Sequence, residues 1–352
     1  MPSPRRRAAS IAVLAVGAAL LAACSAPAAA SPSASATPTP SVTATATPSR
    51  TPTPQPPATA ISPLRGTEVL ASTITGPALS AKVDDHWDAR PQWGLEHTDL
   101  VFEELVEGGI TRYVAVWFSD VPAEIGPVRS IRPMDPDIVT SLGGIVAYSG
   151  GQQRFVDMML DTPVHNAIHG GADDRFMYRT AAKAAPHNVI VKAQELRAAY
   201  ASIPPPQQFA YTSIPRAASA ASYGTPASRI DVRFASGTAR SWTWDAASGA
   251  YLRAQDGAAD LDAEGARLKA TNVVAMSVGI DWSYGIIPRT IMIGSGPAWI
   301  STGGRTLQAT WTKTSRESPI RLTDQHGVPI SLAPGNTWIE LVPNTQPVTV
   351  VP

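Results

Sequence analysis

The chain lacks the cysteines of a disulfide scaffold, because it has one cysteine among 352 residues. A single cysteine forms no intrachain bridge, so the fold must be stabilised by its core. Zinc sites of the zinc-finger type are excluded for the same reason. The chain also lacks an excess of charge of either sign, since 28 basic residues balance 28 acidic ones. Without a basic surplus, the composition argues against nucleic acid as a partner.

A long hydrophobic run is also missing near the N-terminus. Three arginines, Arg5 to Arg7, precede an uncharged stretch, Ala8 to Ala23, that is shorter than the roughly 20 residues a membrane span needs. This order is typical of a secretory signal peptide. The stretch ends in Leu21-Ala22-Ala23-Cys24, which resembles the lipobox of bacterial lipoproteins.

The lipobox resemblance implies that residues 1–23 are a signal peptide and that Cys24 carries a diacylglycerol. We therefore expect an extracytoplasmic protein that is lipid-anchored to the outer face of the cytoplasmic membrane. The alternative is an ordinary secretory signal with a chance cysteine, which would export the chain without an anchor.

Apolar residues are scarce after Cys24, where alanine, serine, threonine and proline dominate up to Ala60. Such a stretch buries too little apolar area to offset the entropy of ordering, and prolines favour extended geometry. We predict a disordered tether over 24–60. At roughly 3.1 Å per residue, it could reach on the order of 100 Å when fully extended.

The rest of the chain exceeds one typical core, so we expect two domains. The run Pro204-Pro205-Pro206 and the small, polar stretch Ala217 to Ser228 indicate a linker at 206–227. This predicts a mixed α/β N-terminal domain at 61–205 and a β-rich C-terminal domain, sandwich or barrel-like, at 228–352. The predicted fold class is α+β.

Both periodicities occur in the N-terminal domain. Leu100 to Glu107 and Ile110 to Ser119 are rich in strand formers and flank Gly108-Gly109, which predicts a hairpin. Short helices are expected at Pro136 to Leu142, Gln152 to Leu160 and Val191 to Ala201, and a strand at Gly144 to Ser149.

In the C-terminal domain nearly every signal is that of a strand. Alternation and regular turns predict strands at Ile230 to Phe234, Trp242 to Trp244, Gly249 to Arg253, Asn272 to Val278, Thr290 to Ile293, Thr306 to Thr312 and Thr337 to Val342.

Three N-terminal motifs and several C-terminal ones resemble the YerB-like lipoproteins, a family catalogued as a domain of unknown function. The N-terminal motifs are Ala89 to Leu95, Val106 to Tyr113 and Ile125 to Pro133, with Pro186-His187-Asn188 as a further match. The C-terminal ones are Trp242 to Asp256, Asn272 to Val274 and Leu332 to Trp338.

The resemblance spans roughly Val69 to Pro343 and implies a two-domain extracytoplasmic lipoprotein whose activity is not established. It implies no cofactor. One departure is visible: family members usually carry an Asp-Asn pair where this chain has Asp84-Asp85, which puts a role for an amide there in doubt.

Charged residues concentrate around the predicted hairpin. Glu103, Glu104 and Glu107 lie on one strand and Arg112 opens the next. Glycan cleavage by two carboxylates needs a gap of about 5 to 10 Å, whereas residues four apart on a strand are roughly 13 Å apart. The spacing argues against Glu103 with Glu107 as a catalytic pair, and an ion pair across the hairpin is the structural alternative.

Two further loops offer binding groups. Arg129 and Arg132 lie between prolines and could clamp a phosphate or carboxylate; alternatively, they bind backbone carbonyls and fix the loop. Ser149 ends a predicted strand before a predicted helix, where free N–H groups could face an anion, although the stretch lacks the spacing of a nucleotide-binding loop.

Histidines give no strong metal or nucleophile pattern. His187 beside Asn188 could act as a general base, or as an ordinary loop residue with a satisfied hydrogen bond. His165 and His169 have helical metal-pair spacing, but Thr162-Pro163 favours extended chain, so we expect no metal site.

Two hypotheses follow. The first is a binding protein that contacts a cell-wall polymer, a peptide or an envelope protein through the N-terminal domain, with the membrane lipid as its anchor. The second is a hydrolase or transferase acting on wall glycan or an anionic wall polymer, which would use Glu104 or Glu107 with Arg112, Arg129 and His187. Whether the protein is an enzyme is left open by the sequence.

Overall fold

The computed structural model describes residues 56–352. The expected signal peptide, Cys24 and most of the expected tether lie outside the described residues. Strand β1 (Thr59–Ile61) pairs with β2 (Glu68–Leu70), so Thr59 and Ala60, which the sequence assigned to the tether, lie in the first strand of the described residues.

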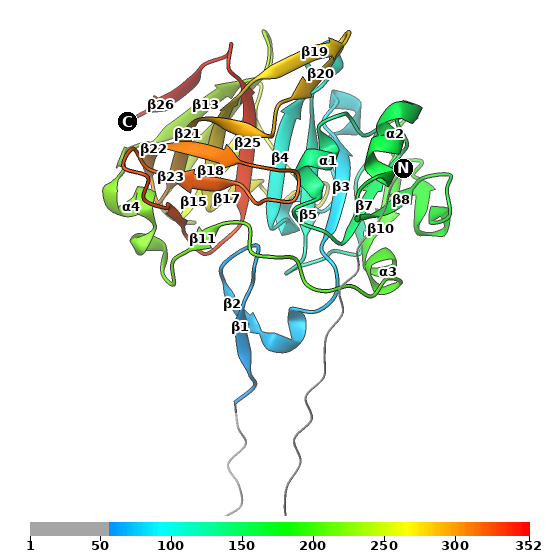
Figure 1. Ribbon diagram of the computed structural model, residues 1–352, viewed down its shortest axis with the longest axis horizontal. Coiled ribbons are helices and arrows are strands. Elements are labelled where there is room, and N and C mark those ends of the chain that lie inside the picture. The colour runs from blue at the N-terminus through cyan, green and yellow to red at the C-terminus, as the bar shows by residue number, and fades with distance from the viewer. Residues whose placement is uncertain (1–55) are drawn as a thin grey trace, which may run out of the picture. The chain divides into compact units, whose positions relative to one another are not determined.

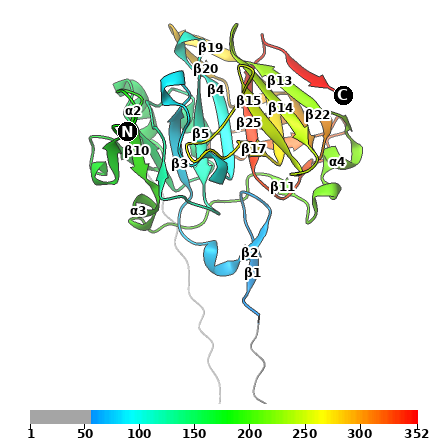
Figure 2. The same cartoon turned by 180° about the vertical axis from the view of Figure 1, so that it is seen from behind.

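One eleven-stranded sheet runs through the described residues and takes strands from both 61–205 and 228–352 (Figures 1 and 2). At its middle, β25 lies parallel to both β18 and β4. Backbone hydrogen bonds of β25 therefore join the two stretches that the sequence assigned to separate domains. The order is β12 (Thr225–Pro226), β22 (Arg305–Lys313), β21 (Gly294–Thr302), β18 (Asn272–Val278), β25 (Thr337–Pro343), β4 (Leu100–Leu105), β5 (Thr111–Trp117), β3 (Leu79–Asp84), β7 (Ile145–Tyr148) and β8 (His165–Ile168), with β23 (Arg321–Thr323) paired to β22.

Smaller sheets accompany this central sheet. A six-stranded sheet comes wholly from the C-terminal stretch: β16 (Ala258–Ala259), β15 (Ala250–Gln255), β14 (Ala239–Asp245), β13 (Arg229–Arg233) and β26 (Val348–Val351), with β17 (Lys269–Ala270) paired to β15. The others are β6 (Glu124–Ile125), β10 (Val189–Lys192) and β9 (Met177–Arg179); β11 (Ala210–Tyr211) with β24 (Ser331–Leu332); and β19 (Ile280–Tyr284) with β20 (Ile287–Thr290).

The central sheet separates two hydrophobic cores, because successive side chains of a strand point to opposite faces. On one face, Phe102 and Val114 pack with Ile138 of α1 (Asp135–Val139) and Phe155 of α2 (Gln153–Leu160). On the other face, Tyr113 and its neighbours pack against the six-stranded sheet. Both faces are covered, so each strand of this region is buried along its length.

The expected mixed α/β character of residues 61–205 needs correction. The described helices there are short: α1 has five residues, α2 eight and α3 (Ala193–Ala198) six. Strands dominate this stretch as they do the C-terminal one. The barrel-like alternative for 228–352 is also wrong, since its strands form open sheets with free edges.

The predicted hairpin forms with a shorter first strand. β4 ends at Leu105, and the 3-10 turn Glu107–Gly109 leads into β5. Gly108 and Gly109 have φ of 77° and 75°, a conformation that glycine adopts without the steric cost of a side chain. Glu107 therefore lies on the turn rather than on the strand.

The stretch 206–227 is more ordered than a linker. It contributes β11, β12 and α4 (Ser219–Tyr223), and Phe209, Ala218 and Ala220 are buried. Strand β21 escaped prediction because Gly294, Gly296 and Pro297 weaken strand propensity. Within residues 56–352, no helix has the length and apolar character required to cross a membrane.

Candidate functional site

Most of the sequence-selected charged residues meet on one face of β3, β5 and β4. In the antiparallel register Arg112 lies opposite Asp84 on one side and Glu104 on the other. Lys82 shares the face of Asp84, because residues two apart on a strand point the same way. We call this group the arginine–carboxylate cluster; its members are Lys82, Asp84, Glu104, Glu107, Arg112, Arg129, Arg132, Asp135 and His187.

Lys82 holds the buried end of the cluster. Its Nζ donates to Glu104 and, at 2.7 Å, to Asp135. Burial disfavours the ammonium form and lowers the pKa of Lys82 to about 8, although Asp135 acts in the opposite direction. One carboxylate oxygen of Glu104, Oε2, is buried without a hydrogen-bond partner among the described residues.

Arg132 is fully engaged with its own surroundings. Its Nε and Nη2 donate to the two oxygens of Glu107, with 2.7 Å for the Nε bond, and its Nη1 donates to the carbonyl of Ile131 at 2.7 Å. Arg132 therefore binds a backbone carbonyl of its own loop, as in the structural alternative given above, and the carboxylate of Glu107. It has no free N–H pair with which to form a ligand clamp together with Arg129.

Glu107 is held ionised by this arrangement. Burial acts to raise its pKa, but the hydrogen bonds and charge of Arg132 outweigh it and lower the pKa to about 2. Arg112 adds a weaker contribution, with its Nη2 3.9 Å from Glu107 and its Nη1 donating to the carbonyl of Ser130. A carboxylate that is ionised at neutral pH is a poor general acid.

Asp84 organises the more exposed end. Its Oδ2 lies 2.6 Å from Nδ1 of His187 and 3.2 Å from Nε of Arg129. Burial, together with the nearby His187, lowers the pKa of His86, whose ring stacks on that of His187 with centroids 4.2 Å apart. The His187 turn, far along the chain, is thus brought to the end of β3.

Arg129 differs from its neighbours in how little it is used. Its side chain is 21% exposed, its backbone N–H donates to the Lys82 carbonyl, and Asp84 is its ion-pair partner. Among the described residues, its guanidinium donates no hydrogen bond, and its Nε has no partner of hydrogen-bond geometry.

The two remaining sequence candidates support the cluster from outside. The backbone N–H of Ser149 donates to the Arg129 carbonyl at 3.1 Å, which fixes the arginine loop against the end of β7. Asn188 accepts from Arg179 at 2.7 Å and donates to the Thr180 carbonyl, so its amide closes the turn before β10 instead of orienting His187.

A second ion-pair network lies on the opposite face of the same strands, and sequence reasoning missed it. Arg240 donates to Glu103 at 2.8 Å and to Asp85 at 2.9 Å, while Arg253 donates to Glu103 at 2.5 Å and also binds Asp260. The side chains of Asp85, Glu103, Arg240 and Arg253 are at most 1% exposed.

The arginine charges keep the pKa values of Asp85 and Glu103 below their usual ranges, although burial acts to raise both. This network ties β14 and β15 to β4 and to the end of β3. Asp85 thus supplies a buried carboxylate for Arg240. The sequence did contain one indication of this network. Glu103 and Glu104 are consecutive in a strand, so their charges must lie on opposite faces of the sheet.

Within residues 56–352, two groups of side chains offer clustered metal ligands. His86, Asp88 and His187 form one, and Glu96, His97 and Glu264 the other; within each, one ligand atom per residue lies within 4.8 Å of the others. The pair weighed from sequence is not among them: His165 lies in β8 and pairs with Asp173 at 2.8 Å, while His169 pairs with Asp174.

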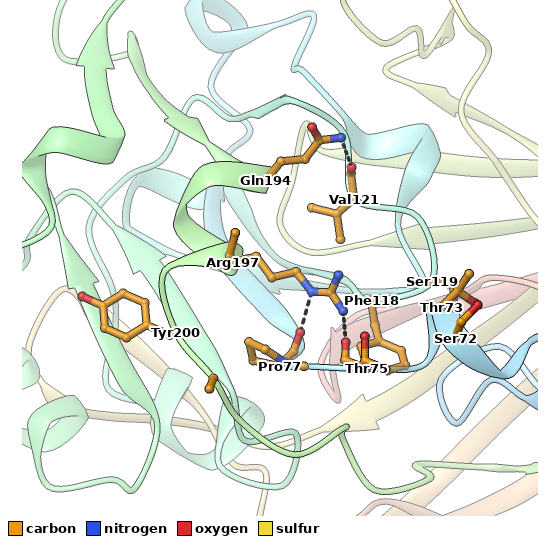
Figure 3. A pocket seen from close by; sticks show the side chains of 13 residues that line it. Ser72, Thr73, Thr75, Pro77, Phe118, Ser119, Val121, Gln194, Arg197 and Tyr200 are labelled. Carbon is orange, nitrogen blue, oxygen red and sulfur yellow. Dashed lines mark hydrogen bonds between the residues drawn. The ribbon is translucent and has the colours of Figure 1, made fainter.

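A pocket lies apart from the arginine–carboxylate cluster. Figure 3 shows a pocket of about 550 Å³ beside α3, into which Arg197 and Gln194 project. Arg197 is used internally, since it donates to the carbonyls of Pro77 at 2.8 Å and Thr75 at 2.6 Å, and Gln194 donates to the Val121 carbonyl. The lining is otherwise hydroxyl and apolar groups, which supplies little chemistry.

A cavity of about 370 Å³ borders the turn of Glu107 and includes Trp282, Asn344 and Gln346. Trp282 is 56% exposed, in contrast to Trp242, Trp311 and Trp338, which are buried in the cores.

Comparison with known proteins gives consistent matches. Residues 65–204 match the model for the "Protein of unknown function (DUF3048) N-terminal domain", and residues 230–339 match that for the corresponding C-terminal domain. The chain is 25% identical over 303 residues to "Putative lipoprotein YerB" of Bacillus subtilis (strain 168), covering 82% of this chain and 88% of that protein. Its fold is similar to the crystal structure of the YerB protein from Bacillus subtilis, with a TM-score of 0.71 and 20% identity, covering 82% of this chain and 99% of that one.

Proposed function

The chain belongs to the DUF3048 family, as its motifs predicted, and from that premise we propose a lipid-anchored envelope protein that binds an anionic ligand at Arg129. The lipobox at Leu21 to Cys24 and the lipoprotein name of the relative support the anchor. The ligand would be reached outside the membrane, where wall polymers and peptide stems carry carboxylates and phosphates.

The state of Arg129 carries this proposal. A guanidinium presents five N–H donors in a planar fork that matches carboxylate and phosphate oxygens. In Arg112 and Arg132, N–H groups are already bound to backbone carbonyls, and in Arg132 also to Glu107. The Arg129 guanidinium is partly exposed and donates no hydrogen bond within residues 56–352.

The backbone around Arg129 is fixed before any ligand arrives. The N–H of Val128 donates to the Val189 carbonyl at 2.8 Å, and the N–H of Arg129 donates to the Lys82 carbonyl at 2.8 Å. The Arg129 carbonyl in turn accepts from Ser149. A loop held on both sides loses little conformational entropy when a ligand binds, which favours affinity.

Acid–base hydrolysis of a wall glycan or anionic polymer is the alternative function. It needs a carboxylate that is protonated near neutral pH. Glu107 has a pKa of about 2, and Glu104 is bound to Lys82 in the buried end of the cluster. These contacts favour binding over hydrolysis by this pair.

Retention on purified cell wall tests the proposal. We expect the full mature protein, in detergent, to be retained, and Arg129→Ala to reduce retention about tenfold or more. Arg129→Lys should restore part of it, because an ammonium carries the charge without the bidentate fork. Arg233→Ala is the control, since Arg233 is exposed on β13, away from the cluster.

Equal retention of wild type and Arg129→Ala would remove Arg129 as the binding group. Retention of none of the variants, wild type included, would remove the wall as the source of the ligand.

A further inference from the structure

Two histidines and an aspartate from distant parts of the chain meet beside Asp84. His86 and Asp88 follow β3, while His187 comes from the turn before β10, and 103 residues separate Asp84 from His187. One ligand atom of each of the three side chains lies within 4.8 Å of the other two. We infer that His86, Asp88 and His187 bind a divalent transition-metal ion, for which Zn²⁺ is the best match.

The spacing of His86 and Asp88 fits one ion. Nδ1 of His86 lies 3.5 Å from Oδ2 of Asp88. Zinc bonds of about 2.0–2.1 Å at a tetrahedral angle put two ligand atoms about 3.3 Å apart. His86 Nδ1 accepts the backbone N–H of Asp88 at 3.3 Å, so Nδ1 is unprotonated here, and this long hydrogen bond must break when Nδ1 binds the ion.

His187 is prepared as the second nitrogen ligand. Its Nδ1 lies 2.6 Å from the buried Asp84, which leaves Nε2 as the nitrogen with a free lone pair. A carboxylate on the far nitrogen is the arrangement that orients metal-binding histidines and raises their basicity. Asp84 thus contributes without touching the ion.

Binding requires a rearrangement of the two histidine rings. The two imidazole rings are nearly parallel, at 14°, so they must tilt for their nitrogens to point at a common centre. Asp88 is 56% exposed, which leaves it free to rotate and leaves the ion open to solvent. The His86 ring packs against the rings of Trp87 and His187, with centroids 3.7 Å and 4.2 Å away, so its tilt requires these rings to move too.

The ligand set selects the kind of ion. Imidazole suits zinc, copper, nickel and iron, whereas magnesium and calcium prefer sites made of oxygen alone. Three protein ligands leave at least one position for water or for an anionic oxygen, as in open sites and unlike closed structural ones. Asp84 and Asp88 bring carboxylates close to the two imidazoles, which favours a bound cation at the histidines.

This inference goes beyond the proposed function and does not depend on it, because the metal can be titrated without any wall ligand. Calorimetric titration of the chelator-treated full chain with Zn²⁺ should give one site. His86→Ala, His187→Ala and Asp88→Asn should each weaken binding by at least about 10–100-fold, the loss known for groups that merely orient a ligand. Co²⁺ should give the visible absorption of a site with nitrogen ligands in wild type, and not in His187→Ala.

Two controls separate the site from others. His326→Ala, in an exposed turn, should leave Zn²⁺ affinity unchanged, as should His97→Ala, which removes the other histidine-containing group. Asp88→Asn keeps the test valid if a histidine variant fails to fold, because this side chain is exposed. Absence of Zn²⁺ binding by wild type, loss of binding in His97→Ala, or full affinity in Asp88→Asn and His86→Ala would each overturn the inference.

Discussion

Glu103 and Glu104 are consecutive in β4, yet their carboxylates point to opposite faces of the central sheet and join different ion-pair networks. Glu104 accepts from Lys82 in the arginine–carboxylate cluster, and Glu103 accepts from Arg240 and Arg253. Both carboxylates are fully buried. β4 therefore carries buried charge on both of its sides, and each charge has a specific partner.

Removing the charge of Glu103 should destabilise the fold strongly. Glu103→Gln leaves two buried guanidinium groups short of a counter-charge, and breaking buried pairs costs about 3–5 kcal/mol. Because Asp85 and Asp260 remain as partners, we expect a loss near the lower end. Urea unfolding measures it, with the exposed Glu68→Gln as a control that should change stability by less than about 0.5 kcal/mol. A loss below about 1 kcal/mol would contradict the role given to this carboxylate.

Glu107 should make stability depend on acid pH. Its folded pKa of about 2 lies below the ordinary value of 4.5, so its contribution is present above pH 4.5 and is lost as the pH falls toward 2. A shift of this size corresponds to about 3 kcal/mol, reduced to about 1–2 kcal/mol because the side chain is partly exposed. The difference in unfolding free energy between wild type and Glu107→Gln should therefore shrink between pH 5 and pH 3. A difference that stays constant over that range would assign the effect to something other than this ionisation.

Two tryptophans should respond very differently to truncation. Trp242→Ala removes a side chain with no exposed area, whose Nε1 donates to Glu340 at 2.7 Å, and we expect a loss of about 3–5 kcal/mol. Trp282→Ala, on the exposed hairpin β19–β20, should cost less than about 1 kcal/mol. Denaturant midpoints of the two variants give the comparison. Equal losses of stability in the two variants would contradict the exposed position of Trp282.

Substitutions at Gly143 and Gly144, which precede β7, should distinguish the effect of a steric clash from that of backbone strain. A Cβ at Gly144 would lie 2.2 Å from the Ala78 carbonyl oxygen, whereas a Cβ at Gly143 would meet nothing within 4 Å. Both have positive φ, which alone costs a residue other than glycine about 1–2 kcal/mol. Gly143→Ala should lose about that much stability, and Gly144→Ala clearly more, because backbone must move. Thermal unfolding of the pair tests this, and equal losses would remove the close approach to Ala78 as a constraint.

The lipid anchor gives the simplest cellular prediction. Cys24→Ser removes the sulfur that would carry the diacylglycerol, so the protein should move from the membrane fraction to the soluble extracytoplasmic fraction. Mass spectrometry of the wild-type N-terminus should find a lipid-modified cysteine. An intact leader, or an unmodified thiol in membrane fractions, would show that the lipobox is not used.

Local patterns predicted much of the candidate site. The Gly108-Gly109 hairpin and the arginines between Pro127 and Pro133 drew attention to residues that the structure brings into one cluster. Their chemistry was visible because charge in a strand-rich, glycine-bounded stretch is unusual. The sequence did not indicate which arginine stays free to bind a ligand, because that depends on the carbonyls that face each guanidinium in the folded protein.

Long-range pairing was beyond the sequence. Arg240 and Arg253 lie on strands with the usual alternation of polar and apolar residues. No residue near them in the sequence indicates that Glu103 is their partner. The metal-ligand group was missed for the same reason: the sequence was searched for short spacings, whereas His86 and His187 meet only after the fold forms. The three predicted helices form but are shorter than predicted, because helix ends are the part of an element that apolar periodicity defines least.

The place of β25 in the sheet sets an order for biogenesis. Thr337–Pro343 is made near the end of the chain, yet it fills the gap between β18 and β4 and pairs in parallel with both. Until this segment has been synthesised, β4 and β18 each keep an open edge, and such edges favour pairing with other chains. A chain truncated before residue 337 would therefore lack the strand that joins the two halves of the central sheet, and its two open edges would favour aggregation.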